Sequence, residues 1–140
     1  MIVYTDSSVV SRRLLQEPGG LQGWETWERA ASCGLLRVEV RRTINRGRLE
    51  GALDDERVAA LIEALISFEE ILDWVEIDDL LLARAGQPTA THLKTLDAIH
   101  LAAADAYREQ LARPVVFATH DRQQALGARA LGFEVIGVDA

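Results

Sequence analysis

The stretch "TLDAIHLAAADAYRE", residues 95–109, decides the fold assignment of this chain. Small and apolar residues lie on most sides of the helix that it predicts, which is typical of a helix packed in a protein interior. Asp97 nevertheless lies in the first predicted turn, and Thr95 is available to cap the helix. A carboxylate at a helix N-terminus is favoured by the helix dipole. Asp97 alone therefore has a structural explanation as well as a functional one. The positions of the other acidic residues are needed to decide between these two explanations.

Strand-like and helical segments alternate along the chain. Short β-branched and aromatic runs predict strands, and apolar residues repeating at three and four predict helices. The predicted strands are 1–6, a short segment near 31–33, 71–77, 114–119 and 134–138, and the predicted helices are 7–16, 24–31, 35–49, 54–68, 78–85, 95–109 and 121–131. Strands separated by helices indicate the α/β class, with a mostly parallel central sheet flanked by helices on both faces. No linker divides the chain, so we expect one domain over residues 1–140.

Composition narrows the class of protein. The chain has 140 residues, enough for one domain with a proper core, and 49% of them are hydrophobic. No apolar run approaches the ~18 residues of a membrane span. A single cysteine, Cys33, excludes an internal disulfide framework and a multi-cysteine zinc site. The first residues lack the pattern of a secretory signal, so we expect a cytoplasmic protein with no membrane partner.

The net charge of −7 is unevenly distributed. Residues 37–48 carry five arginines and one acid, whereas residues 50–79 carry eleven acids and one base. An acidic chain binds nucleic acid poorly overall, because phosphate affinity comes from lysine and arginine. The arginines, with Arg41 and Arg42 as candidates for substrate binding, either hold a phosphate backbone locally or form a solvated helix face.

Acidic residues follow two of the predicted strands. Asp6 follows the first strand, and Thr119 and Asp121 follow the strand at 114–119. In open α/β sheets, chemistry gathers outside the carboxyl ends of the strands. Glu39 and Asp97 are two further acids whose neighbours are apolar or basic. Clustered carboxylates repel one another unless a cation lies among them, and a divalent metal ion is the usual solution.

Four segments carry a family resemblance. "YTDSSVV" (4–10), "RVEVRR" (37–42), "LDAIHLAAA" (96–104) and "FATHD" (117–121), the last followed by "ALGFEVIGV", resemble the acidic motifs of PIN-domain ribonucleases. The closest likeness is to the VapC-type toxins of toxin–antitoxin modules, and it covers essentially the whole chain in the right order. The resemblance implies an endoribonuclease dependent on Mg²⁺ or Mn²⁺. It also implies a cognate antitoxin that blocks the site, and a homodimer.

The resemblance implies roles for individual residues. Asp6, Asp97 and Asp121 are the expected metal ligands. Glu39 ligates the metal directly, acts through water, or helps to deprotonate the nucleophile. Thr119 hydrogen-bonds a ligand carboxylate or a metal-bound water. One departure is that the family commonly has Ser or Thr shortly before the helix of the second acid. Here that stretch is "SCGLL", so Ser32 or Cys33 is the expected cap.

Other classes of function stay open at this point. A phosphatase or phosphotransferase like the haloacid dehalogenases would use Asp6 as nucleophile. Such enzymes require a second acid where this chain has Ser8. They also require a lysine, and the one lysine of this chain is Lys94. A non-catalytic domain could bind a partner and keep the acids for metal-dependent stability. A metal-free ribonuclease would need two of the three scattered histidines as acid and base.

Overall fold

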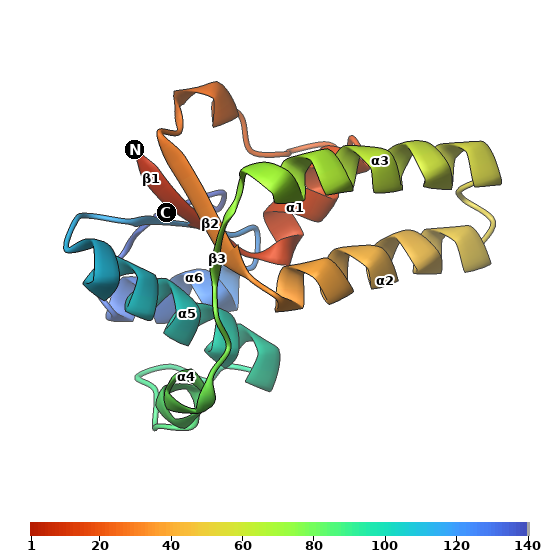
Figure 1. The fold of residues 1–140 in the computed structure, drawn as a ribbon. Helices are drawn as coiled ribbons and strands as arrows, with labels where there is room; N and C mark the ends of the chain where they lie inside the picture. Colours follow the sequence, from red (N-terminus) through yellow and green to blue (C-terminus); the bar gives the residue numbers. More distant parts are fainter. Residues whose placement is uncertain (140) are drawn as a thin grey trace.

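A five-stranded parallel sheet lies at the centre of the chain (Figure 1). The structure is a computed structural model that describes residues 1–139, so the last residue of the predicted domain, Ala140, lies outside the described residues. The strands are β1 (Ile2–Thr5), β2 (Arg29–Cys33), β3 (Asp73–Val75), β4 (Val116–Ala118) and β5 (Glu134–Ile136), and their order is β3-β2-β1-β4-β5. Every neighbouring pair is parallel. The predicted α/β class is confirmed, with a sheet that is wholly and not just mostly parallel.

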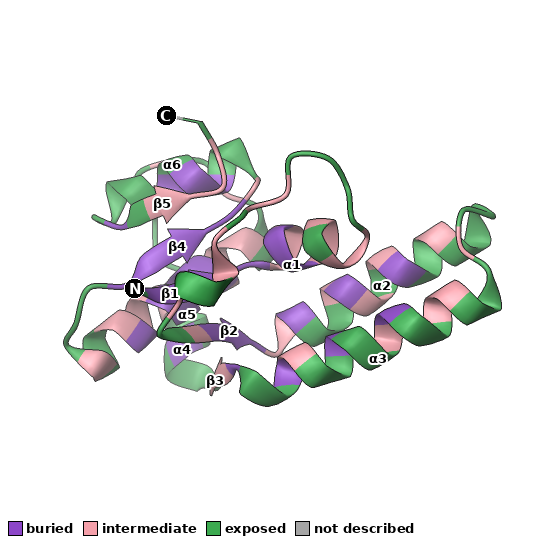
Figure 2. Ribbon diagram, turned by 90° about the horizontal axis from the view of Figure 1, so that it is seen from above, coloured by how far each residue is buried: buried purple, intermediate pink, exposed green. Residues whose placement is uncertain are grey.

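Six α-helices cover the two faces of the sheet. They are α1 (Ser7–Leu14), α2 (Leu35–Leu49), α3 (Asp55–Ile71), α4 (Asp79–Ala85), α5 (Thr95–Leu111) and α6 (Arg122–Ala130). Helices α1 to α3 pack on one face and α4 to α6 on the other, as their hydrophobic clusters show. The central strands β1 and β4, most of β2 and the inner sides of these helices are the buried parts of the molecule (Figure 2). The prediction of helices on both faces is therefore confirmed.

Alternation along the strands divides the core into two halves. Tyr4 and Phe117, which are fully buried and stacked with ring centroids 5.5 Å apart, point to the face covered by α5. Val3 and Val116 point to the opposite face, where α1 contributes the buried Val9. Neighbouring strand residues thus face opposite helical layers, as the two-residue period of a strand requires. The centre of the sheet is mainly apolar, and its buried polar side chains include Thr5 and Ser32.

Helices α2 and α3 lie side by side and project beyond the sheet (Figure 1). Leu61 and Leu65 of α3 are buried against α2, with Val40 and Ile44 opposite them. Asp54 caps α3 by accepting the backbone N–H of Arg57 at 2.7 Å. We call this pair the helical arm, α2 and α3 together.

Two local predictions are wrong. Residues 24–31 do not form a helix, because only a 3₁₀ turn at Trp24–Thr26 precedes β2. The backbone N–H of Glu28 donates to the carbonyl of Met1 at 2.8 Å, so pairing with β1 overrides the local helical pattern. The cap of α2 is neither Ser32 nor Cys33 but Gly34, which makes no side-chain cap bond. Ser32 instead donates its hydroxyl to the carbonyl of Thr5 at 2.8 Å, across β1 and β2.

Helix length and hydropathy bear on the membrane prediction. Within residues 1–139, none of the helices combines the length and the apolar character that crossing a bilayer demands.

Candidate active site

The acidic residues gather at the carboxyl edge of the sheet. Strands β1 and β4 are neighbours, and the backbone N–H of Asp6 continues their ladder by donating to the carbonyl of Ala118 at 3.1 Å. The chain turns from each of these strands directly into a helix, so that Asp6 caps α1 and Asp121 caps α6. The N-terminal half of α2 and the first turn of α5 bring Glu39 and Asp97 to the same edge. Two strand ends and two helix starts thus form the candidate site.

Asp6 is a buried carboxylate with a full set of hydrogen-bond donors. Its Oδ1 accepts the Ser8 hydroxyl at 2.6 Å and the backbone N–H groups of Ser8 and Val9, while its Oδ2 accepts the Thr119 hydroxyl. Burial raises the pKa of Asp6, and the hydroxyl hydrogen bonds from Ser8 and Thr119 work against that rise. Because these donors are neutral, they orient and stabilise the carboxylate without cancelling its charge.

Thr119 joins the acids of the two central strands. Its hydroxyl donates to the Asp6 carboxylate and accepts the backbone N–H of Asp121 at 3.0 Å. The carboxylate of Asp121 in turn accepts the backbone N–H of Gln124 at 2.9 Å. The structure therefore brings the Thr119 hydroxyl to Asp6, one of the carboxylates predicted to bind metal.

Asp97 differs from Asp6 in having no donor. It lies in the first turn of α5, at the third helical position, and Lys94 rather than Thr95 is the residue before the helix. From residues 1–139, the Asp97 carboxylate receives no hydrogen bond. Burial is the largest cause of the raised pKa of Asp97, and the negative charges of Asp121 and Asp6 raise it further. Asp97 therefore lies within electrostatic reach of the other two acids and is destabilised by them.

Glu39 has a partner that sequence reasoning missed. The ring Nε2 of His100 lies 2.6 Å from the Glu39 carboxylate, and its Nδ1 lies 2.9 Å from the Tyr4 hydroxyl. Burial by itself lowers the pKa of His100, but hydrogen bonds to Cys33 and Glu39 raise it to about 10. The buried ring is then positively charged at neutral pH and fixes Glu39 in place. Its position one turn after Asp97, on the same side of the helix, was the available sequence signal.

Two further polar residues complete the site. Ser8, and not its neighbour Ser7, donates to Asp6, and its hydroxyl also accepts the backbone N–H of His120 at 3.0 Å. His120 donates from Nδ1 to the carbonyl of Gly137 at 2.7 Å, so that ring belongs to the junction of β4 and β5. A side chain at Gly137 would collide with the carbonyl of Thr119, which is why this junction carries a glycine at a φ of +103°.

The geometry disfavours two alternatives. The haloacid-dehalogenase-like alternative lacks its second acid, because Ser8 occupies that position and donates its hydroxyl to Asp6. A pair of catalytic histidines is also not assembled. His100 is bound to Glu39, His120 is bound to Gly137, and His92 is exposed.

The two predicted substrate-binding arginines have different surroundings. The guanidinium of Arg41 makes two hydrogen bonds of 2.7 Å to Glu69 and thereby joins α2 to α3. Arg42 is exposed on α2, three residues beyond Glu39, and among residues 1–139 it has no ion pair. Arg42 is thus available to a ligand, whereas Arg41 is already engaged.

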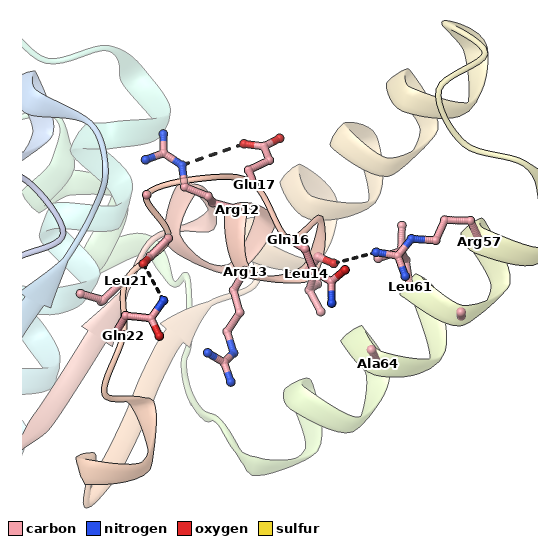
Figure 3. A pocket seen from close by; sticks show the side chains of 13 residues that line it. Arg12, Arg13, Leu14, Gln16, Glu17, Leu21, Gln22, Arg57, Leu61 and Ala64 are labelled. Atoms are coloured by element: carbon pink, nitrogen blue, oxygen red, sulfur yellow. Dashed lines mark hydrogen bonds and ion pairs between the residues drawn. The ribbon is translucent and has the colours of Figure 1, made fainter.

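A second basic region lies apart from the acids. A cavity of about 670 Å³ opens between the end of α1 and α3, and its lining includes Arg12, Arg13 and Arg57 (Figure 3). Arg12 lies 3.9 Å from Glu17, and Arg57 donates to the carbonyl of Leu14 at 3.5 Å. The four acids of the candidate site do not line this cavity.

The donor set fits a hard divalent cation. Within residues 1–139, no three carboxylate, imidazole or thiol side chains form a ready-made metal site. Mg²⁺ does not require one, because it keeps several waters and binds through one or two carboxylates plus substrate phosphates. The acids offer oxygen atoms only, and the negative charges of Asp121 and Asp6 add to burial in raising the pKa of Asp97. Such donors suit Mg²⁺ or Mn²⁺ better than zinc, which favours nitrogen and sulfur.

Comparison with known proteins agrees with this geometry. The sequence model of the PIN domain family matches residues 3–129, a range that contains all four acids. Over 139 aligned residues the chain is 34% identical to Ribonuclease VapC47 of Mycobacterium tuberculosis (strain CDC 1551 / Oshkosh). That match covers 94% of this chain and 93% of the other protein.

Proposed function

Because this chain belongs to the PIN domain family, we propose that it is a metal-dependent endoribonuclease, the toxin of a toxin–antitoxin module. Its similarity to a protein named Ribonuclease VapC47 over nearly the whole length supports the RNA-cleaving activity. The proposal treats residues 1–140 as one nuclease domain, which acts in the cytoplasm on RNA.

One observation carries the proposal. Four acids from four elements meet at one edge of the sheet, and within residues 1–139 no arginine or lysine forms an ion pair with any of them. His100 pairs with Glu39, and its charge also lowers the pKa of Asp6 and of Asp97, although both pKa values stay raised. A protein that only needed to fold would gain nothing from this repulsion, whereas a nuclease needs negative charge to attract a cation to the scissile phosphate.

The side chains then have separate tasks. We assign Asp6, Asp97 and Asp121 to holding a Mg²⁺ or Mn²⁺ ion. When bound, such an ion neutralises charge on the phosphate under attack and makes a bound water more acidic. Thr119 orients Asp6 through its hydroxyl. Glu39, held by His100, is placed to accept a proton from the attacking water.

Substrate contact is assigned to the start of the helical arm. Arg42 carries a free positive charge on the same helix as Glu39, and it is the arginine that we propose for holding an RNA phosphate. Arg41, the other predicted candidate, acts first through Glu69 and holds α2 in position for this contact.

Two protein partners belong to the proposal. One is a cognate antitoxin that blocks the acids, and the other is a second copy of this chain. Two leucines of α4 are exposed, Leu80 at 83% and Leu82 at 45%. Exposed apolar side chains that lie together on a folded protein often mark a protein contact, so these leucines support one. Sedimentation of the purified chain should give a dimer, and Leu80→Glu should shift it toward a monomer.

The function is tested by cleavage of RNA under controlled metal. Purified protein is incubated with mixed single-stranded RNA in Mg²⁺, in Mn²⁺ and in excess EDTA. Cleavage should require the metal, and the products should carry 5′-phosphate and 3′-hydroxyl ends because water, not the 2′-hydroxyl, attacks. Equal cleavage with EDTA, or 2′,3′-cyclic phosphate ends, would contradict the proposal. Asp97→Asn, purified in the same way, controls for a contaminating nuclease.

A further inference from the structure

Gln124 of α6 is a buried polar residue on a helix face where apolar side chains are expected. It is fully buried, and its neighbours on the inner side of α6, Ala125 and Ala128, are small and apolar. A buried amide lowers stability unless both its donor and its acceptor are hydrogen-bonded. What the amide contacts therefore decides what it does.

The two ends of the Gln124 amide differ. Its Nε2 donates to the backbone carbonyl of Asp97 at 3.0 Å. Because a carbonyl can only accept, this bond fixes which end of the amide faces α5. The other end, Oε1, is buried with no partner among residues 1–139. Hydrogen bonds within the described residues thus give the amide nitrogen of Gln124 a partner and leave its amide oxygen without one.

Gln124 also provides the backbone N–H through which Asp121 caps α6. Its backbone N–H donates to the Asp121 carboxylate at 2.9 Å, while its side chain holds the first turn of α5 through Asp97. One residue therefore contacts two acids that come from separate helices. Together with Thr119, which joins Asp6 to Asp121, it completes a chain of bonds through Asp6, Asp121 and Asp97.

We propose that Gln124 is a positioning residue, which sets the separation of Asp97 and Asp121 so that their carboxylates can share one divalent cation. The proposal rests on the proposed function, since it concerns the same metal-dependent site. Asp97 has no donor to its own carboxylate, so the bond to its backbone carbonyl holds it on the α6 side. Loss of that bond frees the first turn of α5 to move away from the repelling charge of Asp121.

The test compares two adjacent glutamines. Gln124→Met keeps the length of the side chain and removes the amide. Gln123→Met is the matched control, because Gln123 lies next to it and also donates to a backbone carbonyl, that of His92 at 2.9 Å, outside the site. Thermal melts in EDTA and over a Mg²⁺ titration measure the stability and the metal binding of both variants and of wild type.

We expect Gln124→Met to be as stable as wild type in EDTA, because the variant also removes the unpartnered Oε1. Its apparent affinity for Mg²⁺ should fall by roughly 10- to 100-fold, the usual effect of losing a residue that orients metal ligands. The Mg²⁺ concentration for half-maximal cleavage should rise in parallel, with the KM for RNA unchanged. Gln123→Met should match wild type in each measurement.

Several outcomes would overturn the inference. A Gln124→Met protein that responds to Mg²⁺ like wild type, at whatever stability, makes Gln124 a structural residue only. A wild type that cleaves RNA and binds Mg²⁺, with both variants identical to it, overturns this inference and leaves the proposed function intact. A wild type with no response to Mg²⁺ and no cleavage overturns both.

A measurement on wild type keeps the test independent of how the variants fold. In nitrogen-15 NMR spectra, the side-chain amide of Gln124 and the backbone amide of Asp97 should shift along one Mg²⁺ titration curve. The side-chain amide of Gln123 should stay in place. A Gln124 signal that does not move while that of Asp97 does would contradict the proposal.

Discussion

Buried carboxylates occur in two regions of the molecule, and the protein treats them differently. In the helical arm, Glu69 is nearly buried and accepts two hydrogen bonds of 2.7 Å from Arg41. The Nε of Arg37 lies 3.9 Å from the same carboxylate. At the carboxyl edge of the sheet, Asp6 is as buried as Glu69 but receives only hydroxyl and backbone donors. Asp97, close to it, receives none from residues 1–139.

The difference is that between a structural acid and an acid that we propose binds a metal ion. An arginine cancels the charge of Glu69 and fastens α2 to α3. Neutral donors hold Asp6 in one orientation but leave its charge available to a ligand. Substitutions at Asp97, Arg41 and Arg42 test whether the acids of the two regions differ in this way.

The largest effect is expected from Asp97→Asn. Removing one carboxylate from the metal site should reduce cleavage by on the order of a thousandfold or more, since the loss falls on the reaction itself. Asp105→Asn is the matched control, because Asp105 lies on the same helix but is paired with Arg84 and Arg108. Rates are measured on folded protein at saturating Mg²⁺. If the two variants lost the same activity, the acids of the sheet edge would not be functionally distinct.

Arg41→Gln should give the largest loss of stability. It leaves the Glu69 carboxylate nearly buried and without its main partner. Fully buried pairs lose roughly 3–5 kcal/mol in this way, but Arg41 is 38% exposed, so we expect about 1–3 kcal/mol. Urea unfolding measures the difference, and the double variant Arg41→Gln with Glu69→Gln should recover most of it. If the single variant has full stability but a raised KM for RNA, Arg41 acts on the substrate instead.

Asp97→Asn should have the opposite effect on stability. The pKa of Asp97 is raised in the folded protein, so the folded state binds a proton more readily than the unfolded chain and the ionised carboxylate lowers stability above that pKa. In EDTA at about pH 7.5 the variant should therefore be more stable, by less than about 1 kcal/mol because Asp97 is only half-buried.

The gain should shrink as the pH falls through the raised pKa of Asp97, where the wild-type carboxylate becomes protonated. Urea unfolding of both proteins at several pH values tracks this trend. A variant that is less stable than wild type at every pH would make Asp97 a helix-start residue, favoured by the dipole.

The smallest effect is expected from Arg42→Gln. Loss of one phosphate contact should weaken RNA binding several-fold and lower the salt dependence by about 0.7 in the logarithmic slope for single strands. Arg48→Gln serves as control, because Arg48 lies on the same helix but pairs with Asp55 at 3.3 Å. Binding is measured in Ca²⁺ or EDTA so that RNA is not cut. An unchanged slope for Arg42→Gln would assign that arginine to solvent or to the antitoxin.

Much of the fold was predictable because burial leaves a strong pattern. The runs of apolar residues around Ile2–Thr5 and Val116–Ala118 indicated the central strands, and the repeat in 54–68 indicated α3 with its capping Asp54. The helix predicted at 24–31 was wrong because Trp24 and Trp27 mimic a helical spacing. In the structure their rings stack at 4.4 Å across a turn, and long-range pairing with β1 makes the next residues a strand.

The acidic residues of the candidate site could be predicted from the sequence. The residues that hydrogen-bond to them could not. Asp6 and Asp121 stand out because each follows a buried strand. The bonds that hold them depend on contacts between distant segments, such as His100 to Glu39 or Gln124 to Asp97, over 61 and 27 residues. Local pattern carries no information about such pairs, and so Arg41 was grouped with Arg42 although Glu69 lies against it.

The strand order has a consequence for the time at which activity can arise. β1 is the first strand to be synthesised, yet it lies in the middle of the sheet, and its pairing with β4 joins residues 113 positions apart. Chains fold from the N-terminus during synthesis, at about 5–20 residues per second. A chain still being translated therefore carries Asp6, Glu39 and Asp97 for several seconds without Thr119 and Asp121 beside them. Assembly of the four acids therefore waits for one late pairing event, so a growing chain does not yet contain the complete acidic site.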